Sequence, residues 1–311
     1  MIIISAGKAF NDIDAFASAL AYRELLAKEG KESLVVFPGP LNHSVTDLAK
    51  NQSTDFVIDY QLKDDDRVVY VDLSDPEHFA FGKGSEEQID ELYDHHYGFE
   101  DYWKEKLGDR SHIERLGAAA TLIWEEFVKR GFPDSISAES ANLLSIAILQ
   151  NTLNFTSTET NDRDRSAFAE LKAHRSMPGG WEDQYFRECT EGMAENFNDA
   201  LRNDTKKIEH LFGASLLVFS QLEITEDPKT FLEMHRTEIP AYWSEFGRAH
   251  RLINIADMSS RTSLLFSDDA DWLSESLSPL FSSILGRGEG WITVPIHQRK
   301  QILKLIQRPQ V

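Results

Sequence analysis

The sequence predicts an α/β protein of two domains, whose N-terminal domain is built on a parallel sheet flanked by helices. Short apolar segments alternate with segments whose apolar residues recur at helical spacing, which is typical of βαβ units. A length of 311 residues suits two domains of ordinary size. The pattern is interrupted near residues 178–200 and then begins again. Together these observations indicate two α/β domains in succession.

The elements of the N-terminal half follow from these patterns in order. Residues 1–5 form an apolar run that ends at Ala6-Gly7, and residues 14–29 carry apolar side chains at helical spacing. Pro38-Gly39-Pro40 closes the second apolar run. The predicted strands are 1–5, 34–37, 68–73 and 89–93. The predicted helices are 14–29, 117–127 and 138–149.

The second half restarts after a breaker, Met177-Pro178-Gly179-Gly180. A polar, helix-like stretch over residues 183–202 follows it. We therefore place the boundary within 178–200, between an N-terminal domain of residues 1–190 and a C-terminal domain of residues 197–311. The strands predicted in the second half are 216–219, 252–255 and 263–266, with helices between and after them.

Charge and composition exclude several classes of function. With 52 acidic and 32 basic residues the formal charge is −20, which argues against binding nucleic acid or an anionic membrane. A small phosphorylated anion is still compatible, because a local pocket can be positive. The single cysteine, Cys189, excludes an intrachain disulfide and a cysteine-based zinc site. Without a membrane-spanning segment or a signal sequence, we expect a cytoplasmic protein.

Acidic residues and histidines follow three of the predicted strands. Asp12 and Asp14 come after the first strand, Asp72 ends the third, and the triplet Asp94-His95-His96 ends the fourth. Ligand sites of parallel sheets lie at the carboxyl ends of the strands, and these donor types suit a divalent first-row metal. Each feature also has a structural explanation, such as a helix cap, a turn or a loop.

The combination of the three motifs resembles the DHH phosphoesterase superfamily. Within it, the segment Gly7 to Ala15 is similar to the first motif of family II (manganese-dependent) inorganic pyrophosphatases and exopolyphosphatases. Further segments resemble the same families in the same order. They are residues 117–121, 147–155, 204–206, 219–223 and 298–301. The resemblance covers nearly the whole chain.

This resemblance implies an active site in the cleft between a DHH domain and a smaller C-terminal α/β domain with a mixed sheet. It implies Mn²⁺ or Mg²⁺ as cofactor, a small phosphorylated anion as substrate, no nucleic-acid or membrane partner, and a possible homodimer. The implied metal ligands are Asp12, Asp14, Asp72, His95 and Asn151. The implied substrate-binding residues are Lys206, Arg299, Lys300 and His96. The implied catalytic residues are His96, Asp94, which orients the histidines, and Lys8.

Two positions depart from the family pattern. Lys8 stands where the pyrophosphatases carry a metal-binding histidine, and Asn151 stands where an aspartate is expected. An ammonium group has no lone pair to donate, and an amide oxygen brings no charge. We therefore hypothesise that only one metal ion is tightly bound and that the Lys8 ammonium stands in for the other.

The predicted function is hydrolysis of a phosphoanhydride, either pyrophosphate or short-chain polyphosphate, by metal-activated water. One alternative is a nucleotide phosphomonoesterase or phosphodiesterase, with stacking by Trp243, Trp272 or Trp291, which we expect in the core instead. Residues 286–290 contain glycines but no histidine, which weighs against an oligonucleotide substrate. The other alternative is a degenerate protein that binds a phosphorylated ligand with little turnover.

Overall fold

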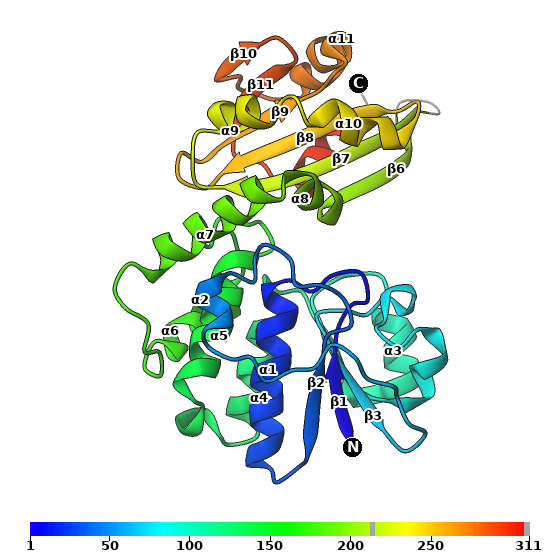
Figure 1. Ribbon diagram of the computed structural model, residues 1–311, viewed down its shortest axis with the longest axis vertical. Coiled ribbons are helices and arrows are strands. Elements are labelled where there is room, and N and C mark those ends of the chain that lie inside the picture. The colour runs from blue at the N-terminus through cyan, green and yellow to red at the C-terminus, as the bar shows by residue number, and fades with distance from the viewer. Residues whose placement is uncertain (212–214, 308–311) are drawn as a thin grey trace. The chain divides into compact units, whose positions relative to one another are not determined.

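The computed structural model describes residues 1–211 and 215–307, which form two compact units. The first unit is Met1–Tyr185 and the second is Phe186–Val311. The first contains an all-parallel sheet and the second a mixed sheet, each with helices on both faces (Figure 1). The predicted fold class is therefore confirmed. The division between the units falls inside helix α7 (Trp181–Glu195).

The first sheet has five parallel strands in the order β2-β1-β3-β4-β5. The strands are β1 (Ile2–Ser5), β2 (Ser33–Val36), β3 (Arg67–Val71), β4 (Ile89–Asp94) and β5 (Ser111–Ile113). The strand order reverses at β1, because β2 lies on one side of it and β3 on the other. In an open parallel sheet, the carboxyl ends of the strands beside such a reversal are where ligands bind.

Helices cover both faces of this sheet, with α1, α4 and α5 on one side and α3 on the other (Figure 1). The helices are α1 (Ile13–Lys28), α2 (Asp47–Lys50), α3 (Glu100–Leu107), α4 (Ala119–Lys129), α5 (Ala138–Asn151) and α6 (Asp162–Leu171). Helix α1 is buried along most of its length, because α4 and α5 pack against it. Beneath α3, the rings of Tyr70 and Phe79 stack with centroids 3.9 Å apart, next to Trp103.

The second sheet has six strands in the order β10-β11-β9-β8-β7-β6, and β7 and β8 pair in parallel while the other pairs are antiparallel. The strands are β6 (Thr205–Leu211), β7 (Ser215–Ile224), β8 (His250–Asp257), β9 (Thr262–Phe266), β10 (Gly286–Gly288) and β11 (Trp291–Pro295). The helices are α8 (Phe197–Asn203), α9 (Pro228–His235), α10 (Ile239–Trp243), α11 (Ala270–Trp272) and α12 (Arg299–Ile306). A core cluster joins residues of α11 and α12 to one sheet face.

The structure differs from the sequence prediction mainly in the second unit. The predicted strands 216–219, 252–255 and 263–266 lie within longer strands β7, β8 and β9. Strands β5, β6 and β10 were not predicted, because β5 is only three residues long, β6 is polar, and β10 reads Gly-Arg-Gly. Strand β11 was also missed, although its residues are largely apolar. The polar stretch 183–202 is two helices, α7 and α8, separated at Asn196.

Candidate functional site

Asp12 and Asp14 lie at the start of α1, directly after β1 and its loop. The Oδ1 atom of Asp12 accepts hydrogen bonds from the backbone N–H groups of Asp14 and Ala15, both at 3.0 Å. Asp14 is fully buried, and its carboxylate accepts from the N–H groups of Ala119 (2.7 Å) and Ala120 (2.8 Å) at the start of α4. The positive end of the α4 dipole thus holds this carboxylate in place.

Asp72 follows β3 in a left-handed backbone conformation, with φ at 56°. Aspartate tolerates this region better than most residues, and such strain is concentrated at functional sites. Its N–H donates to the carbonyl of Tyr93 at 2.7 Å, which fixes the turn. The buried Oδ1 atom accepts no hydrogen bond of normal geometry, yet it lies 3.3 Å from His95 Nε2 and 3.7 Å from His96 Nδ1.

The histidines at the end of β4 are oriented by two acceptors. His95 Nδ1 lies 3.1 Å from the carbonyl oxygen of Leu116, which can only accept, so Nδ1 carries the proton and the Nε2 lone pair faces Asp72 and Asp14. The buried Oδ1 of Asp94 accepts from the N–H groups of His95 and His96 and contacts His96 Nδ1 at 2.8 Å. The His96 side chain is 54% exposed.

These carboxylates carry negative charge that no cation balances. Burial raises the pKa of Asp14 to about 6, an effect that His95 opposes and Asp12 increases. Burial and the charges of Asp12 and Asp14 hold the pKa of Asp72 well above its usual value. Within residues 1–211 and 215–307, no lysine or arginine forms an ion pair with Asp12, Asp14, Asp72 or Asp94.

The arrangement fits a divalent metal ion. Asp72, His95 and His96 each offer a ligand atom, and these atoms lie within 4.8 Å of one another. One buried oxygen of Asp72 has no hydrogen bond, and one imidazole presents its lone pair toward it. Carboxylate and imidazole donors suit Mn²⁺ and other first-row divalent ions. We call these three residues the Asp72–His95–His96 group.

Lys8 and Asn151, the two departures from the family pattern, have other neighbours. The Lys8 side chain is exposed, and its charge adds to that of Lys83 in lowering the pKa of Glu77. The Asn151 amide donates to the carbonyl of Ala147 in its own helix at 3.4 Å. In the part of the chain that the structure describes, no hydrogen bond or ion pair joins either residue to the Asp72–His95–His96 group.

The second unit brings together the three cations predicted to bind substrate. Arg299, at the start of α12, donates to the carbonyl of Asp204 at 2.7 Å and pairs with the Asp204 carboxylate. Lys206 in β6 lies near enough that burial, together with the charges of Arg299 and Lys300, lowers the pKa of Lys206. Residues far apart in the sequence thus form one positive group within this unit.

One residue beside the predicted site was missed from the sequence. His43 lies in the loop after β2, and its buried Nδ1 atom has no hydrogen-bond partner. Burial lowers the pKa of His43 to about 4, and the Asp12 carboxylate opposes this shift. The rule that selected Asp72, a polar residue after a predicted parallel strand, could also have selected His43.

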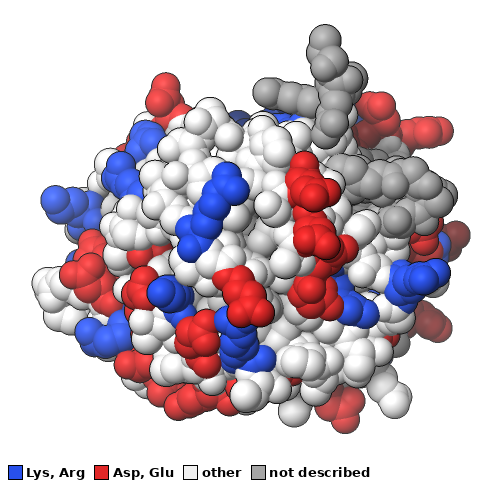
Figure 2. Space-filling model, turned by 90° about the horizontal axis from the view of Figure 1, so that it is seen from above, with Lys and Arg blue, Asp and Glu red and all other residues white. Residues whose placement is uncertain are grey.

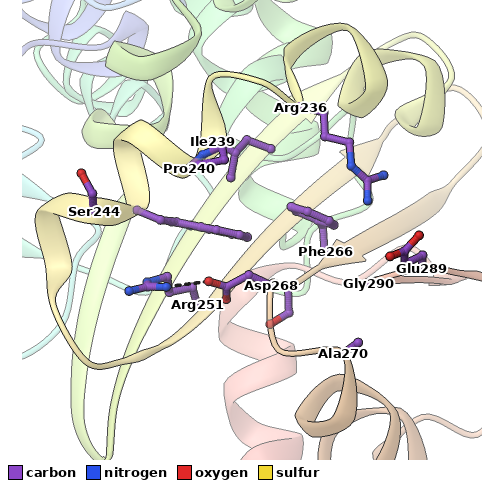
Figure 3. Close-up of a pocket in the computed structure, with 12 residues that line it drawn as sticks. Arg236, Ile239, Pro240, Ser244, Arg251, Phe266, Asp268, Ala270, Glu289 and Gly290 are labelled. Atoms are coloured by element: carbon purple, nitrogen blue, oxygen red, sulfur yellow. Dashed lines mark hydrogen bonds and ion pairs between the residues drawn. The ribbon is translucent and has the colours of Figure 1, made fainter.

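A separate pocket of about 520 Å³ lies in the second unit between α10 and the end of β9 (Figure 3). The rings of Trp243 and Phe266 stack in its wall, and Arg236 lies 5.4 Å from the Phe266 ring centre. Arg251 pairs with Asp268 across the same wall (Figure 3). Lys206, Arg299 and Lys300 do not line this pocket, so it is distinct from the positive group.

Acidic and basic side chains are mixed on the face that Figure 2 displays. Among the helices of the described residues, none has the length and hydropathy needed to cross a bilayer.

Comparison with solved structures identifies the fold. A Methanococcus jannaschii protein assigned as a family II inorganic pyrophosphatase is similar over 98% of both chains, with a TM-score of 0.68 and 15% identity. The chain has that pyrophosphatase fold. An exopolyphosphatase-related protein from Bacteroides fragilis is similar over 98% of this chain and 90% of its own, with a TM-score of 0.51 and 14% identity. The resemblance drawn from the sequence motifs is confirmed at the level of the fold.

Sequence comparison adds one partial match. An A-adding tRNA nucleotidyltransferase from Aquifex aeolicus is 29% identical over 177 residues, which are 55% of this chain and 19% of that protein. The chain therefore spans about a fifth of the length of this curated relative. No family model matches the chain.

Proposed function

We propose that this chain is a metal-dependent phosphohydrolase that cleaves a phosphoanhydride, either pyrophosphate or short-chain polyphosphate. The observation that carries the proposal is the buried Asp72 carboxylate, whose Oδ1 lacks a hydrogen bond and lies 3.3 Å from His95 Nε2. This pair lies at the carboxyl ends of β3 and β4 in a pyrophosphatase fold. A site of this charge and donor chemistry calls for a divalent cation.

Mn²⁺ or Mg²⁺ is the proposed cofactor, held by Asp72 and His95 with help from Asp12 and Asp14. When bound, such an ion polarises phosphate oxygens and lowers the pKa of water to a useful range. The Leu116 carbonyl keeps the proton of His95 on Nδ1, so Nε2 is available as a ligand atom without rearrangement. The fixed amides of α4 do the same for Asp14 by holding its carboxylate in one position.

His96 and Asp94 are the proposed proton-handling pair. Asp94 accepts the Nδ1 proton of His96 at 2.8 Å, and because the His96 ring is half-exposed, its Nε2 atom can contact a phosphate oxygen or the leaving group. Lys206, Arg299 and Lys300 are proposed to neutralise the remaining phosphate charge. The substrate is therefore a small phosphorylated anion in this proposal, with no nucleic acid involved.

A second function is favoured by Lys8 and Asn151. Because neither position carries the metal ligand of the family pattern, the chain would then bind a phosphorylated ligand and turn it over slowly or not at all. The two proposals share the metal and phosphate contacts and differ only in rate.

The test measures phosphate release from pyrophosphate, tripolyphosphate, long-chain polyphosphate, a nucleoside monophosphate and a dinucleotide, each with Mn²⁺ and with Mg²⁺. Asp72→Ala is the blank, and Asp75→Ala, in the turn three residues later, is the matched control. We expect release from the first two substrates, abolished by Asp72→Ala and kept by Asp75→Ala. Release from nucleotides alone would support an esterase, and no release above the blank would support the ligand-binding alternative.

The substrate cations are tested in the same assay. Lys206→Met and Lys300→Met should raise the KM for pyrophosphate, whereas Lys207→Met, whose ammonium lies over the Phe246 ring at 5.2 Å, should leave it unchanged. Equal KM values for all three variants would remove the second-unit cations from the proposal.

A further inference from the structure

A loop that the sequence motifs did not include runs beside Asp12. His43 belongs to this loop, which follows β2. The N–H of Asn42 donates to the carbonyl of Asn11 at 2.9 Å, and the N–H of Asn11 donates to the carbonyl of Pro40 at 2.8 Å. The residue preceding His43 is therefore bonded to the residue preceding Asp12.

The side chain of the residue after His43 is hydrogen-bonded to the backbone of the residue after Asp12. The N–H of Ile13 donates to Ser44 Oγ at 2.9 Å. Ser44 is itself fixed, because its N–H and its hydroxyl donate to Asn42 Oδ1 at 2.9 and 2.6 Å, and its carbonyl accepts from Tyr185. These contacts hold the loop that carries His43 beside the segment that carries Asp12.

The His43 ring is placed without the partner that a buried imidazole requires. Its Nδ1 atom is buried and makes no hydrogen bond, which is unfavourable unless another group satisfies the lone pair or proton. Asp12 interacts electrostatically with His43 and also with Asp14 and Asp72. Asp12 therefore links His43 to the Asp72–His95–His96 group.

We propose that His43 is a metal ligand, and that with Asp12 it forms a second cation position beside the Asp72–His95–His96 group. This inference rests on the proposed function, since it assumes a metal at that group. A cation there would satisfy the His43 ring and would balance carboxylates that no described lysine or arginine neutralises. His43 would supply, from a different loop, the imidazole that Lys8 cannot provide, and two ions per chain would bind.

The first test counts metal ions. The metal-free full chain is titrated with MnCl₂ and followed by calorimetry, for the wild type, His43→Ala, His43→Gln and Asp72→Asn. His78→Ala is the matched control, because this exposed histidine lies 3.7 Å from Asp75 and away from the proposed ligands. We expect two ions in the wild type and in His78→Ala. In the His43 variants one ion should be lost or bound at least about ten-fold more weakly.

The second test identifies the ligand itself. The electron spin echo of bound Mn²⁺ is modulated by each coordinated imidazole nitrogen, and the His43 variants should lose one such nitrogen relative to the wild type. If both His43 variants fail to fold, the wild type alone decides: diethyl pyrocarbonate should modify His43 in the metal-free chain, and Mn²⁺ should protect it, while His78 is modified equally in both states.

The outcomes separate this inference from the proposed function. Unchanged stoichiometry, affinity and nitrogen modulation in the His43 variants would overturn the role of His43, as would equal modification of His43 with and without Mn²⁺. A single ion per wild-type chain would overturn it as well. If Asp72→Asn also bound Mn²⁺ like the wild type, the metal site of the proposed function would itself be wrong.

Discussion

Two groups of buried charge in the first unit are built in opposite ways. At one, which we call the Arg130 cluster, the Arg130 guanidinium donates to Tyr22, Tyr93 and the carboxylates of Glu29, Glu91 and Glu126, over 2.8–3.3 Å. Lys31 pairs with Glu29 at 2.7 Å, and Lys129 pairs with Glu126 at 2.7 Å. Three carboxylates therefore meet three cations.

The second is the group of carboxylates at the ends of β1, β3 and β4. The charges of Asp12 and Asp14 raise the pKa of Asp72, and Asp12 raises that of Asp14. Among the described residues, histidines and the backbone N–H groups of α4 oppose these shifts, and no lysine or arginine pairs with the three carboxylates. A balanced cluster serves stability, whereas an unbalanced one weakens the fold until a ligand binds. The contrast between them favours the carboxylate ends as the candidate site.

The largest expected effect is at the balanced cluster. Arg130→Met would leave the partly buried Glu91 without its cation and Glu126 with Lys129 alone, and we expect the free energy of unfolding to fall by about 3–5 kcal/mol. Urea denaturation of the metal-free chain measures this. Arg110→Met, which breaks an exposed pair with Asp90, is the control and should lose less than about 1 kcal/mol. Similar losses in both variants would show that the Arg130 cluster is not special.

Bound metal should stabilise the fold only through the carboxylates at the ends of β1, β3 and β4. At a free Mn²⁺ concentration a hundred times its Kd, the free energy of unfolding should rise by about 2.7 kcal/mol in the wild type. Asp72→Asn should show no such rise, although without metal it should be at least as stable as the wild type, because it removes uncompensated charge. Thermal melts with and without Mn²⁺ measure both effects. If metal-free Asp72→Asn were clearly less stable than the metal-free wild type, the contrast between the two charge groups would be contradicted.

The pH dependence should follow the raised pKa of Asp14. Between its usual value of 3.8 and its folded value of about 6, folded Asp14 keeps a proton that the unfolded chain has lost. The free energy of unfolding of the metal-free chain should therefore fall as pH rises through this window, by about 1–2 kcal/mol. Asp14→Asn should remove this part of the slope. If the free energy of unfolding of Asp14→Asn changed with pH as steeply as that of the wild type, the raised pKa of Asp14 would be contradicted.

The smallest effect is expected at the edge of the Arg130 cluster. Lys31 is half-exposed, so its pair with Glu29 is screened by water. Lys31→Met should lower the free energy of unfolding by less than about 1 kcal/mol, which the same urea series measures. A loss close to that of Arg130→Met would mean that the outer pairs, and not the guanidinium, hold the cluster.

Elements and site residues that are visible in a local sequence pattern were predicted, and those that depend on contacts between distant segments were missed. Asp72 and His95 could be found because each lies at the end of an apolar run, and Asp12 because it lies between such a run and a helix. His43 follows the second predicted strand and could have been selected by the same rule, but its neighbour Asp12 is reached only in the folded chain. Arg130 could not be found, since its partners come from other helices and strands that meet only after folding. Edge strand β6 was missed because its residues are polar, and three-residue strands such as β10 carry no detectable period.

Helix α4 joins the two charge groups that the comparison sets apart. The amides of its first turn bind Asp14, and Arg130 follows its last residue. Eleven helical residues span about 16 Å. Because the helix is short, we expect it to move as a rigid body, so that a shift of its first turn at Asp14 also shifts its C-terminal end at Arg130. Substitutions at Arg130 and at Asp14 would add if the helix did not couple its two ends, so a deviation of more than about 0.5 kcal/mol in a double-mutant cycle would measure this transmission.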